Sequence, residues 1–314
     1  MRGKVEAVST SPSKGMRKVP QPIVELIAGQ GIAGDAHAGF SHRQVSLLAV
    51  ESIRKMQAMG VAVAAGDFAE NITLCAIDLS RVSVGTRLTL GGSAVLSITQ
   101  LGKECHERCA IYYQAGDCVM PREGVFAEVL RGGQVMPGDS VIVWPKLQVL
   151  VITLSDRCAR GETQDESGPA IANELALLGA TVQATLLADD YDQLVQQLRS
   201  ACDCGDFDVV LTTGGTGLAP RDITPEATLA VVEREVPGMA EAMRALSLSK
   251  TPMAMLSRAV VGVRKRTMII NLPGSKKGAL ECLGIVLPVL PHAQEVMRGH
   301  SLDCGRSHST RLWP

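Results

Sequence analysis

Residues 209–226 have the sequence VVLTTGGTGLAPRDITPE, which joins a strand to a helix through a glycine-rich loop. Val209–Thr213 is an apolar run typical of a buried strand. The glycines that follow allow backbone N–H groups to approach a phosphate without a Cβ atom in the way. Thr224 and Pro225 mark a helix start, which adds N–H donors and a positive dipole end. Asp222 is placed to hold a hard cation, so the stretch predicts a site for phosphate and Mg²⁺.

The second half of the chain alternates strands with helices. We expect strands at 149–154, 181–187, 209–213 and 267–272, and helices at 167–178, 191–201, from about 225, from about 239 and within 276–298. Ser167 is expected to cap the helix that it begins. This alternation is typical of a parallel sheet covered on both faces, in which ligands bind beyond the carboxyl ends of the strands. Three strands run into polar or glycine-rich turns: Ser155-Asp156-Arg157, Gly214-Gly215-Thr216-Gly217 and Pro273-Gly274-Ser275.

The first half is predicted to consist mainly of strands. They are expected at 72–74, 82–84, 87–90, 94–98 and 140–143, with one helix at about 46–59. Trp144-Pro145-Lys146 interrupts the pattern, because proline cannot continue a strand ladder. We therefore expect a strand-rich α+β domain at 1–146, an α/β domain at 147–303 and a polar tail at 304–314.

The composition limits the classes of function. The 314 residues include 31 Lys or Arg and 32 Asp or Glu, so the chain lacks the basic excess typical of proteins that bind nucleic acid or an anionic membrane. No apolar run is long enough to predict a transmembrane helix, and the start of the chain has no apolar signal core. Nine cysteines without an export signal indicate reduced thiols, so we expect a cytoplasmic protein.

The second half resembles the molybdopterin adenylyltransferase family, the Mog-type domain of molybdenum cofactor synthesis, over about 147–299. The resemblance lies in Ser155-Asp156-Arg157, the run 212–228, Pro237-Gly238, the run 254–258 and Asn271-Leu272-Pro273-Gly274. It implies a three-layer α/β fold with a mostly parallel sheet, commonly a trimer. The implied enzyme is a nucleotidyltransferase that joins molybdopterin to ATP, giving adenylylated molybdopterin and pyrophosphate, and that requires Mg²⁺.

The resemblance also implies two acids that support Mg²⁺ and nucleotide, Asp222 and Asp189. Asp222 stands in an unaltered Pro-Arg-Asp context, whereas the family's Pro-Asp is replaced by Ala188-Asp189-Asp190 here, so either Asp189 or Asp190 can serve. The two neighbouring acids can instead begin a solvated helix. The chemistry suits these residues, because two polyanions that meet need a cation and N–H donors.

Other polar residues at the turns also have a purely structural interpretation. The glycine loop lacks the spacing of a P-loop and of a Rossmann fingerprint. Arg221 is either a phosphate clamp or a member of a surface ion pair. Ser155 and Asp156 either bind pterin or phosphate or cap the end of their strand. Ser275, Lys276 and Lys277 differ from the usual family loop, and the two lysines either bind an anion at a helix start or are solvated.

The first half resembles the MOSC domain, named for the carboxyl-terminal part of molybdenum cofactor sulfurase, over about 5–144. The matching segments are residues 31–35 and 66–72, with Val84-Gly85 and Gly138-Asp139 at later turns. The resemblance implies a barrel-like α+β domain that binds molybdenum cofactor or carries sulfur on a cysteine. The family cysteine usually follows an Arg-x-Pro sequence, whereas Gly102-Lys103-Glu104 precedes Cys105 here.

Cys105 is the candidate for that catalytic cysteine and for a molybdenum ligand. Lys103 and Arg108 are near enough in sequence to favour its thiolate. Cys105, Cys109 and Cys118 with a neighbouring histidine also suggest structural zinc, although their spacing is poor for it. As a third alternative, Cys109 and Cys118 only pack. The sequence leaves open which of the three cysteines is functional.

Together these features predict a bifunctional protein. Its carboxyl half adenylylates molybdopterin with ATP and Mg²⁺, and its amino half binds molybdenum cofactor or transfers sulfur. A metal-insertion protein and further copies of the chain, as a trimer, are the expected protein partners. His37 and His42, in a polar loop beside Arg43, either contact an anionic ligand or are simply exposed. The alternative function is a non-catalytic protein that binds and delivers pterin or molybdenum cofactor.

Overall fold

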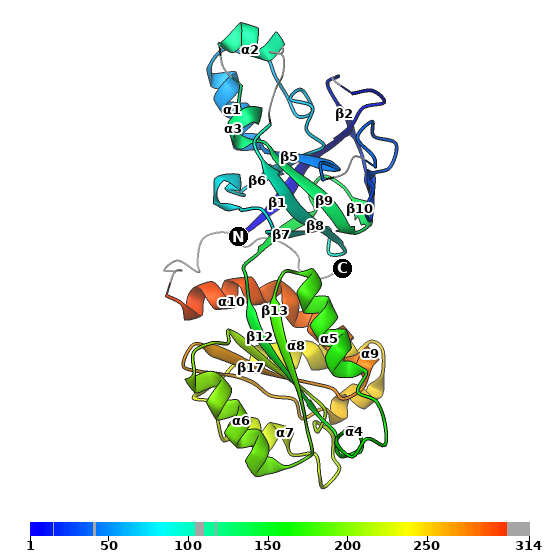
Figure 1. Cartoon of the computed structure of the whole chain (residues 1–314), viewed down its shortest axis with the longest axis vertical. Helices are drawn as coiled ribbons and strands as arrows, with labels where there is room; N and C mark the ends of the chain where they lie inside the picture. Colours follow the sequence, from blue (N-terminus) through cyan, green and yellow to red (C-terminus); the bar gives the residue numbers. More distant parts are fainter. Residues whose placement is uncertain (15, 40–41, 104–109, 117, 300–314) are drawn as a thin grey trace. The chain divides into compact units, whose positions relative to one another are not determined.

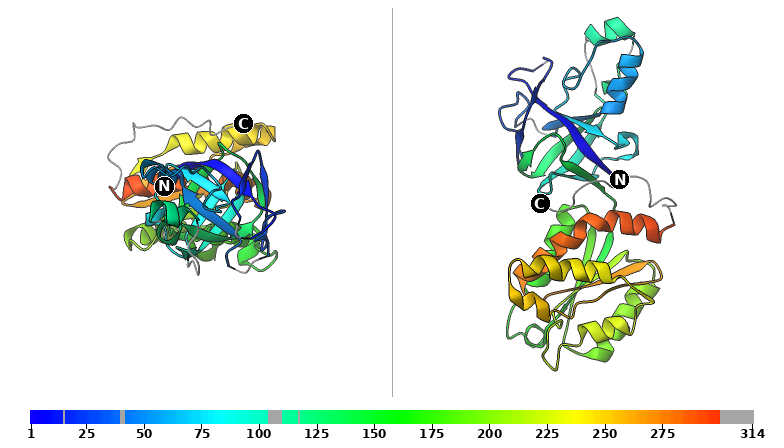
Figure 2. Two further views of the ribbon diagram at one scale, coloured as in Figure 1. Left: turned by 90° about the horizontal axis from the view of Figure 1, so that it is seen from above. Right: turned by 180° about the vertical axis from the view of Figure 1, so that it is seen from behind.

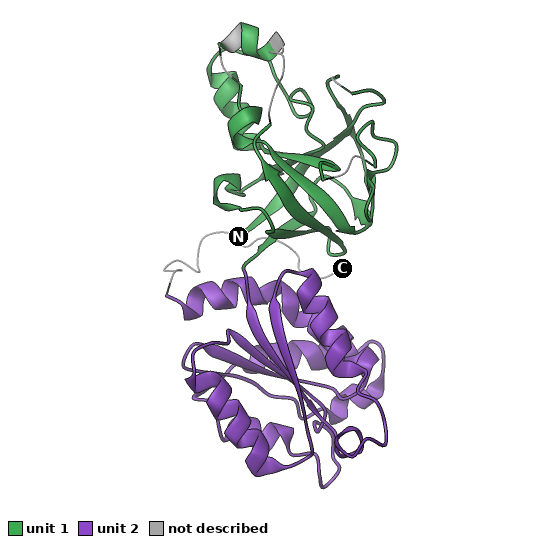
Figure 3. Cartoon of the chain, viewed as in Figure 1, with its two compact units in different colours: residues 1–145, 309–314 green, residues 146–308 purple. Residues whose placement is uncertain are grey.

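The computed structural model describes residues 1–14, 16–39, 42–103, 110–116 and 118–299. They form two compact units, unit 1 within Met1–Pro145 and unit 2 from Lys146 onward (Figure 3). Cys105 and its neighbours at 104–109 lie outside the described residues, as does the tail expected at 304–314. No helix of the described residues is both long and apolar enough to cross a membrane.

Unit 1 contains a closed seven-stranded barrel. Its strand order is β11-β7-β8-β9-β5-β6-β1, and β11 pairs back to β1. Only β5 and β6 run parallel; the other barrel pairs are antiparallel. The strands are β1 (Arg2–Thr10), β5 (Val45–Ala49), β6 (Ile72–Cys75), β7 (Arg87–Leu90), β8 (Ala94–Leu101), β9 (Val125–Arg131) and β11 (Ser140–Trp144). Buried side chains such as Val5, Leu74 and Leu96 fill the barrel, as the alternation of inward and outward residues requires.

Shorter elements surround the barrel of unit 1. β2 (Val19–Gln21) adds to β1, and β3 (Val24–Ile27), β4 (Gly31–Ile32) and β10 (Gly133–Val135) form a small separate sheet. The helical segments are α1 (Val50–Ala58), η1 (Leu79–Arg81), α2 (Ala110–Ala115) and α3 (Met120–Glu123). A second apolar cluster joins Leu48 and Phe126 of the barrel wall to Ile53 and Met56 of α1.

Two expectations for unit 1 are wrong. The helix expected at 46–59 begins only at Val50, because Val45–Ala49 is completely buried and pairs with β6 and β9. An apolar run of this length fits a strand or a helix equally well, so the pairing decides. The strand expected at 82–84 is a turn: the Val82 N–H donates to the Leu79 carbonyl, and the Thr86 N–H donates to the Ser83 carbonyl.

Unit 2 is built on a mixed six-stranded sheet. Its order is β13-β12-β14-β17-β16-β15; the first four strands are parallel, and β16 and β15 are antiparallel to their neighbours. We expected a mostly parallel sheet, whereas the observed sheet is mixed and has an antiparallel edge formed by β16 and β15. The strands are β12 (Gln148–Leu154), β13 (Thr181–Leu187), β14 (Val209–Thr213), β15 (Arg234–Glu235), β16 (Val261–Arg264) and β17 (Thr267–Leu272).

Helices cover this sheet on two faces, because its strands are apolar on both sides (Figure 1). On β12, Leu150 and Ile152 pack with α6 and α7, while α5 and α9 pack together against β12, β13 and β17. α8 lies against α9, and the view from behind brings it to the front in yellow (Figure 2). The helical segments are α4 (Asp156–Ala159), α5 (Ser167–Leu177), α6 (Tyr191–Asp203), α7 (Thr224–Leu229), α8 (Pro237–Leu248), η2 (Pro252–Leu256), α9 (Lys276–Val286), η3 (Leu287–Val289) and α10 (Leu290–Met297).

Candidate functional site

The strand register of unit 2 gathers the three polar turns at one edge of the sheet. Thr153 of β12 pairs with Thr213 of β14, and Thr213 pairs with Leu272 of β17. The chain leaves each strand within two residues of these positions. The turns 155–157, 214–217 and 273–275 therefore meet beyond the carboxyl ends of neighbouring parallel strands, where such sheets bind ligands.

The glycine loop has a backbone that only glycine suits. Gly214 and Gly215 have φ angles of 107° and 63°. A Cβ atom on Gly214 would lie 2.3 Å from the Leu154 carbonyl oxygen, and one on Gly215 would lie 2.4 Å from the Thr224 hydroxyl oxygen. That hydroxyl donates to the Gly214 carbonyl at 2.8 Å, and the Thr224 N–H donates to the Gly215 carbonyl at 3.1 Å. The helix start at Thr224 thus fixes the loop.

Arg258 holds the other end of this loop. Its Nε donates to the Gly217 carbonyl and its Nη2 to the Asp222 carbonyl, each at 2.6 Å, and it also pairs with Glu226. No role was predicted for Arg258 from the sequence. Its place in the run 254–258, which resembles the adenylyltransferase family, was the feature that could have identified it. Since Arg258 already binds the Gly217 and Asp222 carbonyls, the backbone amides of the loop are the groups available to bind a ligand.

Three consecutive backbone amides of the loop are unpaired. Within the described residues, the N–H groups of Gly215, Thr216 and Gly217 have no hydrogen-bond partner, and Thr216 is buried. Buried or half-buried amides are nearly always paired with protein, water or ligand. Successive N–H groups in such a turn form an anion-binding concavity. The loop is therefore able to receive a phosphate.

A cluster of acids and one arginine lies beside the loop. The Asp156 and Asp189 turns bond to each other, since each backbone N–H donates to the other's carboxylate, at 3.0 and 3.1 Å. Arg221 Nη2 donates to the Asp156 carboxylate at 2.9 Å and to the Asp189 carbonyl at 3.1 Å. The ion pair that was the alternative interpretation of Arg221 is therefore present. Asp222 accepts the Ala219 N–H at 2.7 Å, and its carboxylate lies 2.9 Å from where a Gly217 Cβ would be.

The electrostatics of this cluster favour a cation. Burial raises the pKa of the Asp189 carboxyl, and the charges of Asp156 and Asp222 act in the same direction. The hydrogen bond from Arg221 lowers the pKa of Asp156, so that carboxylate is already matched by a positive group. Asp190 accepts the Gln193 N–H at 2.9 Å and caps α6, which leaves Asp189 as the acid that faces the cluster.

The acids suit Mg²⁺ shared with a substrate. No group of three His, Cys, Asp or Glu side chains in the described part of the chain converges to hold a metal by itself. Mg²⁺ is commonly bound by one or two carboxylates, with substrate phosphates and waters completing its shell. Asp189 and Asp222 supply such oxygen donors beside the unpaired amides.

The third turn, 273–275, lies directly against the glycine loop. Thr213 Oγ1 donates to the Pro273 carbonyl at 2.7 Å, and Ser167 Oγ donates to the Gly274 carbonyl at 2.9 Å. A Cβ atom on Gly274 would lie 3.2 Å from the Gly214 Cα. Ser275 caps α9 by accepting the Gly278 N–H at 3.3 Å. These bonds bring together two of the predicted binding segments.

Other predicted residues of this turn region have structural partners. Ser155 Oγ accepts the Cys158 N–H at 3.2 Å and caps the start of α4, a structural role that differs from the expected cap of the strand end. Lys276 lies 3.8 Å from Glu166 in an exposed ion pair, and Lys277 is exposed. A cavity of about 290 Å³ opens beside the turn, and its lining includes Thr216, Gly217, Met253, Leu256, Pro273 and Ser275.

Unit 1 holds a buried charged group outside its barrel core. Lys18 Nζ lies 2.5 Å from Asp35, both side chains are fully buried, and His37 Nδ1 lies 3.3 Å from the same carboxylate. His37 is thus tied to a buried pair. His42 and Arg43 both reach Gln100, at 3.3 and 2.7 Å.

The cysteines proposed for unit 1 are only partly described. Cys105 and Cys109 lie outside the described residues, while Lys103 bonds through its N–H to the Met120 carbonyl at 3.2 Å. Cys118 is buried in the cluster with Ile53 and Met120, which agrees with the packing interpretation of that residue.

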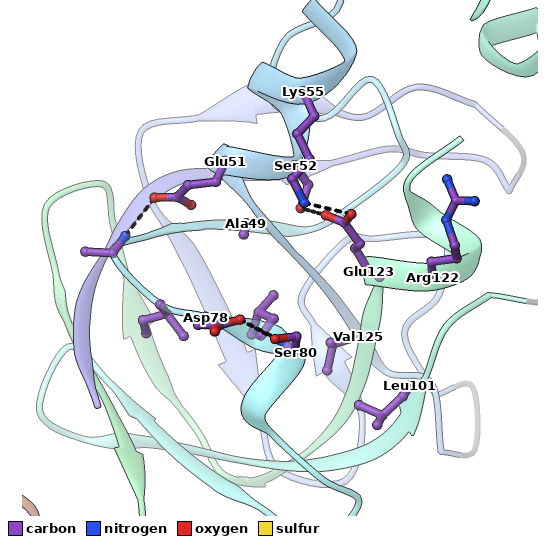
Figure 4. A pocket seen from close by; sticks show the side chains of 14 residues that line it. Ala49, Glu51, Ser52, Lys55, Asp78, Ser80, Leu101, Arg122, Glu123 and Val125 are labelled. Atoms are coloured by element: carbon purple, nitrogen blue, oxygen red, sulfur yellow. Dashed lines mark hydrogen bonds and ion pairs between the residues drawn. The ribbon is translucent and has the colours of Figure 1, made fainter. Parts of the chain in front are cut away.

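A cavity of about 620 Å³ lies beside α1 in unit 1 (Figure 4). Glu123 forms one wall, with Ser52 Oγ at 2.5 Å and Lys55 Nζ at 2.9 Å from its carboxylate. Partial burial opposes the charge of Glu123, but the bonds from Ser52 and Lys55 outweigh it and lower the pKa of this carboxyl. Asp78 and Glu51 border the cavity on another side, and Leu101, at the end of β8, also lines it (Figure 4).

Comparison with known proteins matches each unit separately. Residues 150–292 match the model of a probable molybdopterin binding domain, and residues 34–142 match the MOSC domain. A molybdopterin adenylyltransferase of Helicobacter pylori strain J99 is 41% identical over 171 residues, which is 54% of this chain and 97% of that protein. The Escherichia coli K12 protein of the same name is 42% identical over 140 residues, 44% of this chain and 72% of that protein.

Solved structures match about half of the chain. A molybdopterin biosynthesis enzyme, MoaB from Thermus thermophilus, is 52% identical and covers 49% of this chain and 97% of its own, with a TM-score of 0.47. Both resemblances inferred from the sequence are thus confirmed by the family models and by the curated relatives.

Proposed function

We propose that unit 2 transfers the adenylyl group of ATP to molybdopterin, since the chain belongs to the molybdopterin adenylyltransferase family of molybdenum cofactor biosynthesis. A MOSC domain precedes the adenylyltransferase domain in this chain. The family is one of nucleotidyltransferases, so the expectation of an enzyme is confirmed at the level of the family. One observation carries the proposal: the three unpaired amides of Gly215, Thr216 and Gly217 lie beside the carboxylates of the Asp222 cluster.

The transfer needs two polyanions in line. An oxygen of the terminal phosphate of molybdopterin attacks the α-phosphorus of ATP. The new P–O bond forms as the bond from that phosphorus to the bridging oxygen breaks, and pyrophosphate leaves with the electron pair. Backbone amides that point at the phosphates reduce the repulsion between the phosphate groups of the two substrates and stabilise charge in the transition state.

The residues of the chain divide this work. The amides at 215–217 bind phosphate oxygens, and Arg258 and Thr224 hold the loop that carries them. Asp189 and Asp222 would hold Mg²⁺, which neutralises phosphate charge when bound. Arg221 keeps the Asp156 and Asp189 turns together through the bonds described above.

For unit 1 we propose binding of molybdenum cofactor, with Cys105 as sulfur carrier or molybdenum ligand. The support is the MOSC match over 34–142. Incubation with a persulfide donor followed by mass spectrometry tests the sulfur role: wild-type protein gains sulfur, and Cys105→Ser does not. An equal gain in both proteins removes it.

We further propose a homotrimer, a cytoplasmic location and a metal-insertion protein as partner, on the strength of the family resemblance. A mass measurement in solution tests the first of these: a trimer mass supports it, and a monomer mass overturns it.

Pyrophosphate release by the full chain tests the central proposal. Wild-type protein should release pyrophosphate only when ATP, molybdopterin and Mg²⁺ are all present. Asp222→Asn should slow release by about 100-fold, as expected for loss of a group that stabilises charge in the transition state. Asp206→Asn is the matched control, because Asp206 is exposed and precedes β14 at the other end of that strand. Pyrophosphate release by Asp222→Asn at the wild-type rate would refute the role of Asp222 in binding Mg²⁺.

A further inference from the structure

Asp165 joins the end of β12 to the start of α5 in unit 2. Its Oδ2 accepts the Thr153 hydroxyl at 2.7 Å, at the carboxyl end of β12. Its Oδ1 accepts the N–H groups of Ser167 and Gly168, each at 3.0 Å, at the start of α5. One carboxylate thus fixes a helix start to a strand end.

This arrangement corrects the expected cap of α5. Ser167 is the first residue of the helix and Glu166 is its cap residue, whose side chain makes no cap bond. The Ser167 hydroxyl donates to the Gly274 carbonyl instead. Asp165 accepts the first N–H groups of the helix, which leaves the Ser167 hydroxyl available for this bond. Gly168 has to be glycine, because a Cβ atom there would lie 2.4 Å from the Thr153 hydroxyl and 2.5 Å from the Asp165 carboxylate.

The released hydroxyl reaches the turn at 273–275. Ser167 Oγ is buried and donates to the Gly274 carbonyl at 2.9 Å, and Thr213 holds the preceding Pro273 carbonyl at 2.7 Å. Two buried hydroxyls therefore fix two successive carbonyls. A chain of bonds runs from Thr153 through Asp165 and Ser167 to Gly274.

The candidate site has two parts, the 290 Å³ cavity and the acid cluster of Asp189 and Asp222. The 273–275 turn, which this chain of bonds fixes, lines only the cavity. Pro273 and Ser275 line the 290 Å³ cavity, together with Met253, Leu256 and the loop residue Thr216. The acid cluster of Asp189 and Asp222 is built from other turns, and none of its hydrogen bonds involves residues 273–275. A partly apolar cavity suits a pterin ring, whereas the acids suit a metal-bound triphosphate.

We propose that Asp165 is a positioning residue that acts through Ser167 on the 273–275 turn and thereby sets affinity for the pterin substrate, with little effect on ATP. The inference rests on the proposed function for the identity of the two ligands. It assigns them to separate halves of one site: the Asp165 network serves the pterin half, and the acid cluster serves the nucleotide half.

Equilibrium binding to the full chain tests this division. The dissociation constants of molybdopterin alone and of ATP with Mg²⁺ would be measured for the wild type, Ser167→Ala, Asp165→Ala and Asp165→Asn. Loss of the one buried hydrogen bond from Ser167 to Gly274 predicts about tenfold weaker molybdopterin binding for Ser167→Ala. Asp165→Ala removes all three bonds to its carboxylate and should weaken that binding at least as much. ATP affinity should stay within about twofold. Asp165→Asn keeps an oxygen for the two amides and should restore most of the affinity.

Ser249→Ala is the matched control, because Ser249 Oγ also donates to a carbonyl, that of Leu246, but is exposed at the end of α8. It should change neither affinity. Equal loss of both affinities in Ser167→Ala, or no loss of either, would overturn the inference. Wild-type binding without any pyrophosphate release would instead refute the adenylyl transfer and leave the division of the site standing.

Discussion

At the scale of single residues, Glu70 shows how much a buried charge depends on its partners. Its side chain is fully buried, and Oε1 accepts the Gly66 N–H at 2.6 Å and the Thr73 hydroxyl at 3.0 Å. Its Oε2 has no partner among the described residues. Burial outweighs these bonds and raises the pKa of the Glu70 carboxyl.

Glu70→Gln should therefore gain stability relative to wild type as pH rises. The folded-state pKa lies above the unfolded value, so the buried charge opposes folding at pH 8 and less so as pH falls through the raised pKa. Urea unfolding of both proteins at pH 5 and pH 8 measures this difference. Glu25→Gln, on the exposed side of β3, serves as control. A Glu70→Gln difference that is the same at both pH values would contradict this explanation.

Some features of single residues could not be predicted from the sequence. The acids at 189 and 190 are equivalent in sequence, and only the cap that Asp190 forms on α6 separates them. The ion pair of Arg221 with Asp156 joins residues 65 positions apart, which no local pattern predicts. The glycine loop was predictable, because glycines after a buried strand have a local physical reason.

At the scale of elements, the sequence predicted most of unit 2 and less of unit 1. Strands such as β12 and β14 carry long apolar runs between clear helix signals, so their bounds follow from the pattern. The run Val45–Ala49 became a strand only because β6 and β9 flank it, which is a tertiary effect. The antiparallel edge of β15 and β16 likewise depends on pairing that short strands do not encode.

An ion-pair group joins the end of α6 to the β16–β17 turn. Asp203 lies 3.0 Å from Arg264 and 2.7 Å from Lys265. Hydrogen bonds from these two residues lower the pKa of Asp203 from 3.8 to about 2. The group sits at the surface, so screening by solvent keeps its contribution small.

Asp203→Asn should lose more stability at pH 7 than at pH 3. A lowered folded-state pKa gives stability that is complete above the ordinary value of 3.8 and disappears as pH falls towards about 2. Thermal unfolding of wild type and variant at pH 7 and at pH 3 checks this, with Asp206→Asn as the exposed control. The account of this group fails if the deficit of Asp203→Asn is as large at pH 3 as at pH 7.

At the scale of the whole molecule, two units with different folds share one chain. The class of each unit was predictable, because alternation of helices and strands differs between the halves. The resemblance to the MOSC domain predicted the barrel, and the structure confirms it. Local sequence patterns do not encode its closure by β11 on β1, since that pairing joins residues near positions 2 and 142. The chain thus carries two family matches, to a probable molybdopterin binding domain and to the MOSC domain. If both units act on one intermediate, as proposed above, their linkage raises its local concentration.

The central claim is that the amides of Gly215, Thr216 and Gly217 and a Mg²⁺ held by Asp189 and Asp222 jointly receive the phosphates of ATP. The most direct measurement is a crystal structure of the full chain with Mg²⁺ and a non-hydrolysable ATP analogue. We predict phosphate oxygens within hydrogen-bond distance of these amides, and the metal bound to at least one of the two carboxylates. A nucleotide bound elsewhere, with both carboxylates free of metal, would contradict the account.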